Sequence, residues 1–90
     1  MRDIISYGGF SGTGSQTIKF SEPGSQICIS NDGSGEMKFS LGTSPGGADY
    51  YFFNDMVLLP GEIFDEWVPP FTQIKIEASG PYRGFPRRMI

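Results

Sequence analysis

The sequence predicts one small all-β domain, a β-sandwich or jelly-roll-like fold of about seven short antiparallel strands. Three features of the chain support this fold class. The 13 glycines and 7 prolines divide the 90 residues into short segments. Several segments alternate apolar and polar residues, which is the period of a strand with one buried face. Aromatic residues make up 14% of the chain, a content that disordered chains lack.

The clearest strands lie on either side of a hairpin signal, Asn31-Asp32-Gly33-Ser34-Gly35. Residues 26–30 and 36–41 form this predicted pair, and residues 73–78 form a third clear strand. Alternation places Cys28 on the outer face of its strand, because the residues on both sides of it point inward. The residues predicted to point inward in these three strands are Ile27, Ile29, Met37, Phe39, Leu41, Ile74, Ile76 and Ala78.

Further strands are expected over residues 16–20, 50–53, 56–59, 62–68 and 82–85. The turn residues at 22–25, at Asn54-Asp55 and at Pro69-Pro70 are expected to end strands. In segment 62–68, Ile63, Asp65 and Trp67 share one face. The other face carries Glu62, Phe64, Glu66 and Val68, so the pattern leaves open which face is buried.

The whole chain, residues 1–90, is expected to form a single domain. Its first part is different in composition, because Gly8 to Ser15 is rich in glycine and serine. We therefore expect residues 1–15 to be a flexible or strand-exchanging N-terminal arm. In that arm, Ile4 and Ile5 would add a strand to the edge of a neighbouring copy.

Composition argues against most catalytic chemistries. The chain has no histidine, and Cys28 is its only cysteine. Histidine-dependent nucleophiles and Cys/His zinc sites are thereby excluded, and we expect no cofactor and no metal. A net charge of −3 argues against nucleic acid and anionic membranes as partners. No signal peptide is expected, and a lone cysteine fits synthesis in a reducing cytoplasm.

Two candidate sites for small ligands do not match their motifs. A phosphate-binding loop requires a lysine directly after its last glycine. The first lysine after the segment Gly8 to Gly14 is Lys19, so the segment does not match. A calcium loop placed around Gly35 would put Leu41 where a carboxylate is needed. The acidic residues Glu62, Asp65 and Glu66 remain, either as solvated charges on an edge strand or as the carboxylates of a small hydrolase.

Exposed aromatic and basic residues are the candidate interaction sites. Half of the run Tyr50-Tyr51-Phe52-Phe53 would face outward, and with Trp67 it could form core, a subunit interface or a sugar-stacking platform. The basic residues Arg87 and Arg88 could meet the acidic surface around Asp65 and Glu66 of a neighbouring copy. The residues predicted to form the interface are Ile4, Ile5, Tyr50, Tyr51, Trp67, Arg87 and Arg88.

Four motifs run from Ile27 to Arg87: residues 29–35 with the alternating strand after them, then Leu59-Pro60-Gly61-Glu62, residues 71–76 and residues 80–84. In these motifs the chain resembles small β-sandwich structural proteins of tailed bacteriophages. The resemblance implies a structural or attachment role in a virion that assembles in the host cytoplasm. It provides no catalytic residue.

The sequence therefore predicts a non-enzymatic virion structural protein that self-associates or docks on a larger assembly. The short chain, its 38% hydrophobic content and the lack of a disulfide or metal favour a homo-oligomer. The first alternative is a carbohydrate-binding attachment module that uses exposed aromatic residues. The second is a small hydrolase that uses the carboxylate cluster.

Overall fold

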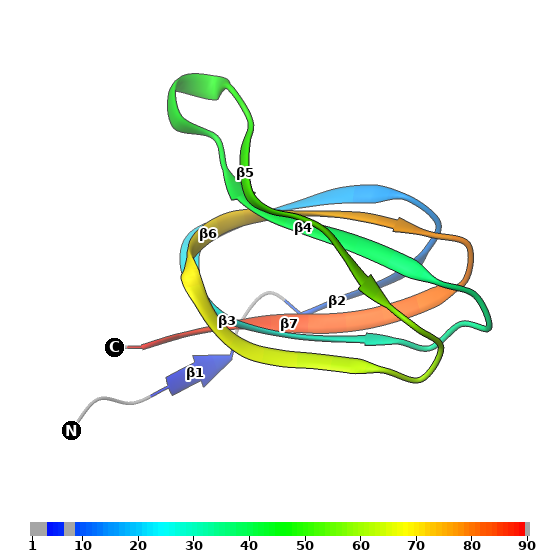
Figure 1. Cartoon of the computed structure of the whole chain (residues 1–90). Helices are drawn as coiled ribbons and strands as arrows, with labels where there is room; N and C mark the ends of the chain where they lie inside the picture. The colour runs from blue at the N-terminus through cyan, green and yellow to red at the C-terminus, as the bar shows by residue number, and fades with distance from the viewer. Residues whose placement is uncertain (1–3, 7–8, 90) are drawn as a thin grey trace.

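The computed structural model describes residues 4–6 and 9–89. Within them, seven antiparallel strands and one short 3-10 helix, η1 (Pro45–Gly47), confirm the predicted all-β domain (Figure 1). The strands are β1 (Ile4–Ser6), β2 (Phe10–Thr13), β3 (Gln16–Asn31), β4 (Met37–Thr43), β5 (Tyr50–Leu58), β6 (Ile63–Ala78) and β7 (Pro81–Met89).

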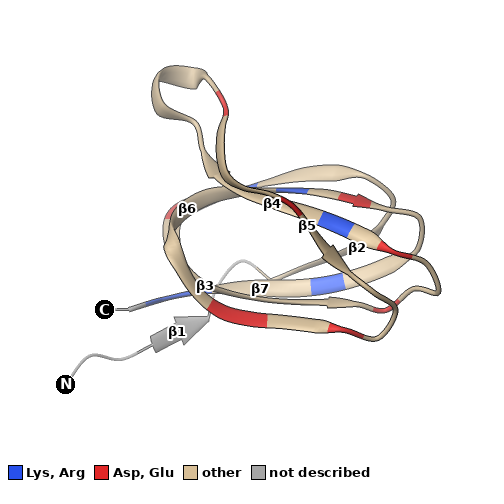
Figure 2. Ribbon diagram, in the orientation of Figure 1, with Lys and Arg blue, Asp and Glu red and all other residues tan. Residues whose placement is uncertain are grey.

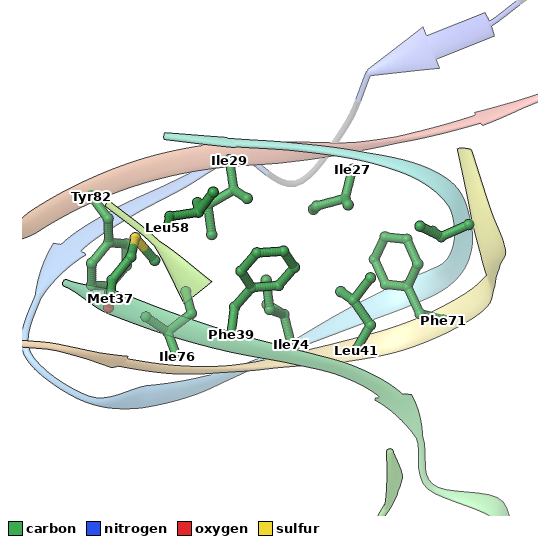
Figure 3. Packing of buried hydrophobic residues seen from close by; sticks show 11 residues of the cluster. Ile27, Ile29, Met37, Phe39, Leu41, Leu58, Phe71, Ile74, Ile76 and Tyr82 are labelled. Carbon is green, nitrogen blue, oxygen red and sulfur yellow. The ribbon is translucent and has the colours of Figure 1, made fainter. Parts of the chain in front are cut away.

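Two long strands, β3 and β6, create the sandwich because each contributes to both layers. The strand order is β1-β7-β3-β6-β4-β5, and β2 also pairs with β7. In the first layer, residues 26–31 of β3 lie between β7 and residues 63–67 of β6. In the second layer, residues 73–78 of β6 lie between β4 and residues 16–19 of β3, and β5 forms the outer edge. The two layers enclose the core (Figure 3).

The predicted strand ends at 22–25 and at Pro69-Pro70 are wrong, because both segments lie inside continuous strands. They are bends rather than turns. The β3–β6 register shifts between Lys19 and Gly24 and again between Gly24 and Gln26. The two prolines fall between the paired positions Trp67 and Phe71. No ladder hydrogen bond is needed from them there, so β6 tolerates proline.

The predicted turn at Asn54-Asp55 is also wrong, since both residues belong to β5. Asp55 has a φ of 53°, and the β4–β5 register is irregular between Phe39 and Leu41. This is a bulge in a continuous strand. Aspartate is among the few residues that adopt this left-handed conformation at low cost.

The segment expected to be an N-terminal arm contains two strands that pair within the chain. In β1, Ile4 is opposite Met89 and Ile5 is opposite Arg88. The glycine-rich segment contains β2, in which Phe10 is opposite Gly84 of β7. Residues 1–3 and 7–8 of the predicted arm lie outside the described residues. Exchange of this arm between copies stays a prediction.

The core confirms the predicted alternation. Every residue predicted to point inward from residues 26–30 and 36–41 is buried, and so are Ile74 and Ile76, while Ala78 is partly buried (Figure 3). Packing between the layers includes an aromatic contact, in which the ring centroids of Phe39 and Phe64 are 5.2 Å apart. The buried apolar residues are Ile27, Ile29, Met37, Phe39, Leu41, Leu58, Val68, Phe71, Ile74, Ile76 and Tyr82.

Asn31, at the end of β3, joins the two loops at one end of the sandwich. Its buried amide group donates to Gly35 O at 2.8 Å and to Leu58 O at 2.9 Å. Its Oδ1 accepts from Gly33 N at 3.0 Å. This side chain therefore stabilises the turn after β3 and also holds the end of β5. The predicted hairpin of residues 26–30 with 36–41 is wrong, because β3 pairs with β6 and β7 whereas β4 pairs with β5 and β6. The turn at residues 32–36 instead carries the chain from one layer to the other.

Candidate interaction surface

The outer surface of the first layer gathers nine side chains in three rows across β7, β3 and β6, and we call it the β7–β3–β6 face. Ile27 and Ile29 point into the core, so their neighbours on β3 point outward. The register then sets the rows, each written from β7 through β3 to β6: Arg83, Ser30 and Ile63; Phe85, Cys28 and Asp65; and Arg87, Gln26 and Trp67.

Large apolar side chains are exposed on this face. Ile63 is 66% exposed and Trp67 is 50% exposed, both on the same side of β6. Phe85 and Cys28 are half-buried beside them. A groove of about 490 Å³ opens at the end of the face near the first row, and Cys28, Ser30, Ile63, Arg83 and Phe85 contribute to its lining. The face therefore exposes two large apolar side chains along β6 and is hollowed at one end.

Charges on the face are separated by strand. Both cations, Arg83 and Arg87, come from β7, whereas Asp65 comes from β6 (Figure 2). Arg87 Nη1 lies 3.6 Å from Asp65 Oδ1, and the Arg87 guanidinium lies 4.8 Å from the ring centroid of Phe85. Gln26 Nε2 also donates to Asp65 Oδ1, at 3.2 Å. These contacts hold Arg87 flat along the face.

The thiol of Cys28 lies at the centre of the face. Burial raises its pKa, the Asp65 carboxylate raises it further, and the Arg87 guanidinium acts in the opposite direction. A raised pKa leaves the thiol protonated near neutral pH, which is the opposite of what a nucleophilic cysteine requires. The geometry therefore supports a structural role for Cys28.

The carboxylates considered for hydrolysis are separated and engaged elsewhere. Glu62 Oε1 accepts from Leu59 N at 2.7 Å and closes the turn between β5 and β6. Asp65 is paired with Arg87. Glu66 is opposite Ile27, on the side of β6 that faces the core, yet remains exposed because β6 is an edge strand here. Among the described residues that line the groove there is no carboxylate side chain.

The structure brings together only part of the predicted interface. Trp67 and Arg87 lie in the same row of the β7–β3–β6 face. Arg88, the next residue of β7, instead pairs with Glu22 at 2.5 Å. Ile4 and Ile5 lie in β1, along the edge of β7 opposite β3.

Tyr50 and Tyr51 lie in the other layer, on β5. Tyr50 is 61% exposed. Tyr51 is half-buried, its hydroxyl accepts from Gln73 Nε2 at 2.8 Å, and Lys75 Nζ is 5.1 Å from its ring centroid. The contacts of Tyr51 are thus made within its own chain, and these two tyrosines are not part of the face that holds Trp67.

Seven of the nine residues of the face are absent from the predicted interface, among them the half-buried or exposed Ile63, Phe85 and Cys28. The correct grouping of Ile63, Asp65 and Trp67 on one side of β6 was available from alternation. Alternation also placed Cys28 on the outer side of β3. What the sequence lacked was the register that sets β7 and β6 on either side of β3.

Comparison of this chain with family models, with curated proteins and with solved structures finds no match. Within the described part of the chain, no three His, Cys, Asp or Glu side chains gather as a metal site would require. Of the same residues, none forms a helix that is long and apolar enough to cross a membrane.

Proposed function

We propose that this chain is a non-enzymatic structural protein of a bacteriophage virion that associates with further copies, or docks on a larger assembly, through the β7–β3–β6 face. The observation that carries the proposal is the exposure of Ile63 and Trp67 on one outer face. Large exposed apolar side chains that include a tryptophan are typical of protein interfaces.

The opposite outer face supports this choice of surface. There the outward positions include Lys19, Lys38 and Lys75, with Val57 as an exposed apolar neighbour of Lys38. Lysine is depleted at interfaces, whereas tryptophan and arginine are enriched. Of the two outer faces, the one with Trp67 and Arg87 is the better candidate for an interface.

The virion is proposed from the resemblance of residues 27–87 to phage structural proteins. Its implied site of assembly is the host cytoplasm. A β-sandwich with an apolar outer face fits the needs of such a component, since capsid and tail parts bury their surfaces against other subunits.

A carbohydrate-binding attachment module is the second candidate. The half-exposed Trp67 beside Gln26 and Arg87 offers an aromatic ring with polar neighbours, the combination that sugar-binding sites use. This candidate predicts glycan binding by a monomer, and the first predicts association without a glycan.

Sedimentation equilibrium at micromolar concentration tests the proposal. We expect an oligomer for the unaltered chain and a shift toward monomer for Trp67→Ala, because loss of a central interface tryptophan commonly costs about 2 kcal/mol or more. Tyr50→Ala is the matched control and should leave the oligomer unchanged. A chain that stays monomeric, and binds a glycan panel only with Trp67 intact, would contradict the proposal and establish the alternative.

A further inference from the structure

We infer that the partner of the β7–β3–β6 face is the same face of a second copy, related by a two-fold axis that runs parallel to β3. This inference rests on the proposed function and names its partner. Its basis is the separation of charge on the face, with Arg83 and Arg87 on β7 and Asp65 on β6. Arg83 and Arg87 each pair with a carboxylate of their own chain, Asp32 and Asp65, and such a rotation brings neither arginine against an arginine of the second copy.

The rotation exchanges β7 of one copy with β6 of the other and leaves each row at the same height along β3. Arg87 of the first copy then meets Trp67 of the second in the third row. The Arg87 guanidinium already lies against Phe85 with one side, and its side chain is 29% exposed. Its exposed side is free to stack on an indole ring, which is a favourable cation–π contact.

The first row is complementary in shape. Ile63 is the most exposed large apolar side chain described, at 66%. After the rotation it lies above Arg83 and Ser30 of the other copy, where the groove of about 490 Å³ is open. Each copy therefore supplies one isoleucine to the groove of the other, so that two isoleucine side chains are buried per dimer.

Other symmetric arrangements of this surface bring like charges together. A two-fold axis perpendicular to the strands would place Arg83 against Arg87 of the second copy. If the β6 edges of two copies paired with Asp65 at the centre, Asp65 of one copy would lie opposite Asp65 of the other. Glu66 would lie nearby on each edge. Like charges directly opposite each other destabilise a strand pair, and acidic residues on an edge oppose edge-to-edge pairing.

Cys28 reports on this arrangement because it occupies the middle row of the middle strand. The rotation axis passes over it, so the two thiols face each other across the interface. Packed sheets are about 10 Å apart, which is too far for a disulfide but suits a short bis-maleimide. Because Cys28 is the only cysteine in the sequence, every thiol alkylation or thiol cross-link can be assigned to it.

The test measures alkylation of Cys28 by iodoacetamide as the protein concentration increases, with the oligomer followed by sedimentation in the same samples. We expect the alkylation rate to fall on the order of tenfold or more as the dimer forms, the effect of burial stronger than 1.4 kcal/mol. A short bis-maleimide should give a covalent dimer at high concentration. Ile63→Glu should weaken association by about tenfold or more and restore fast alkylation.

Val57→Glu is the matched control, since it places the same charge at an exposed apolar strand position on the other outer face. It should change neither association nor alkylation. In the double variant Cys28→Ser, Val57→Cys, alkylation should be independent of concentration. Circular dichroism confirms that each variant is folded.

The outcomes separate this inference from the proposed function. An oligomer in which Cys28 reacts as fast as in the monomer, or which survives Ile63→Glu, overturns the two-fold arrangement and leaves self-association intact. A chain that is monomeric at every concentration overturns this inference and the self-association of the proposed function, and leaves docking on a larger assembly as its remaining form.

Discussion

At the scale of single residues, Asn31 contributes more to stability than its place in a turn motif of the sequence suggests. Its side chain makes three hydrogen bonds of 2.8–3.0 Å with two loops while only 2% exposed. Asn31→Ala removes these bonds and takes away the amide donor to the carbonyls of half-buried Gly35 and buried Leu58. We expect a loss of about 3 kcal/mol in the free energy of unfolding, measured by urea denaturation.

Asn54→Ala is the control for this substitution. Asn54 is exposed and its amide makes one hydrogen bond, to Tyr51 O at 3.1 Å. Its loss should cost less than about 1 kcal/mol. Equal costs for the two variants would show that burial of the Asn31 network is not the source of its effect.

The Cys28 thiol is the second residue-scale test. Its raised pKa means that alkylation of the dilute monomer should increase with pH only above the range of an ordinary cysteine, because the thiolate is the reacting form. Asp65→Asn removes a cause that raises the pKa and should move the pH profile downward. Asp32→Asn, whose carboxylate pairs instead with Arg83, should leave the profile unchanged.

The same shift affects stability. A thiol that keeps its proton more firmly in the folded chain than in the unfolded chain stabilises the fold below the unfolded pKa. That contribution is lost as the pH rises through the raised pKa of the folded state. An alkaline decrease in stability that Cys28→Ser reduces would confirm this sign, and a decrease that the variant leaves unaltered would contradict it.

At the scale of elements, the bends in β3 and β6 form the sandwich, and Gly24 lies where they meet. It is opposite Phe71 in the register, and an added Cβ would lie 2.7 Å from the Phe71 ring. Phe71 is fully buried and cannot move away easily. We therefore expect Gly24→Ala to cost about 2 kcal/mol by chemical denaturation, as overpacking of a core does.

A double-mutant cycle checks the cause. If the ring is the obstacle, Phe71→Leu should cost less in the Gly24→Ala background than in the unaltered chain, because neighbouring substitutions couple. Gly9→Ala is the control, since its added Cβ would meet only Gly84 O at 3.9 Å. Additive costs for Gly24 and Phe71 would exclude the ring as the obstacle.

These bends also explain what the sequence could and could not predict. Alternation at Ile27 and Ile29, or at Ile74 and Ile76, depends only on neighbouring residues, and its inward faces were correct. Glycine and proline signal a bend with the same residues that signal a turn, so Pro69-Pro70 was read as a strand end. β2 has no apolar alternation in Phe10–Thr13, and only its pairing with β7 makes it a strand.

The candidate surface depended still more on long-range pairing. Trp67 and Arg87 could be singled out by residue type. They lie in the same row only because both pair with Gln26 of β3, and this register cannot be derived from the sequence pattern. For Phe85, no feature of the sequence shows whether its side chain points to the outer face or into the core. Tyr50 and Tyr51 looked equally suitable in the sequence. Only the layer to which β5 belongs, and the contacts of Tyr51 with Gln73 and Lys75, separate them from Trp67.

At the scale of the whole molecule, the sandwich is thin. Its Cα atoms extend 39 × 32 × 17 Å, so the fold has two layers and one narrow core between them. Small domains without a disulfide or metal have little stability to spare. A second copy on the β7–β3–β6 face would bury a second apolar layer, and folding would then be linked to association.

This linkage predicts that the melting temperature increases with protein concentration. At a total concentration 100 times Kd, the free folded protomer is roughly 7% of the total, which stabilises each protomer by about 1.6 kcal/mol. For a domain of this size that corresponds to an increase of roughly 6–12 °C over the dilute chain. Differential scanning calorimetry over a dilution series measures it.

Ile63→Glu should abolish the concentration dependence and leave the melting temperature of the dilute chain nearly unchanged, because Ile63 is 66% exposed in the single copy. Val57→Glu should keep both properties of the unaltered chain. If the melting temperature of Ile63→Glu is lower at every concentration by the same amount, Ile63 stabilises the single domain and not the dimer. Stability would then be independent of self-association, and the thin core alone would have to account for the fold.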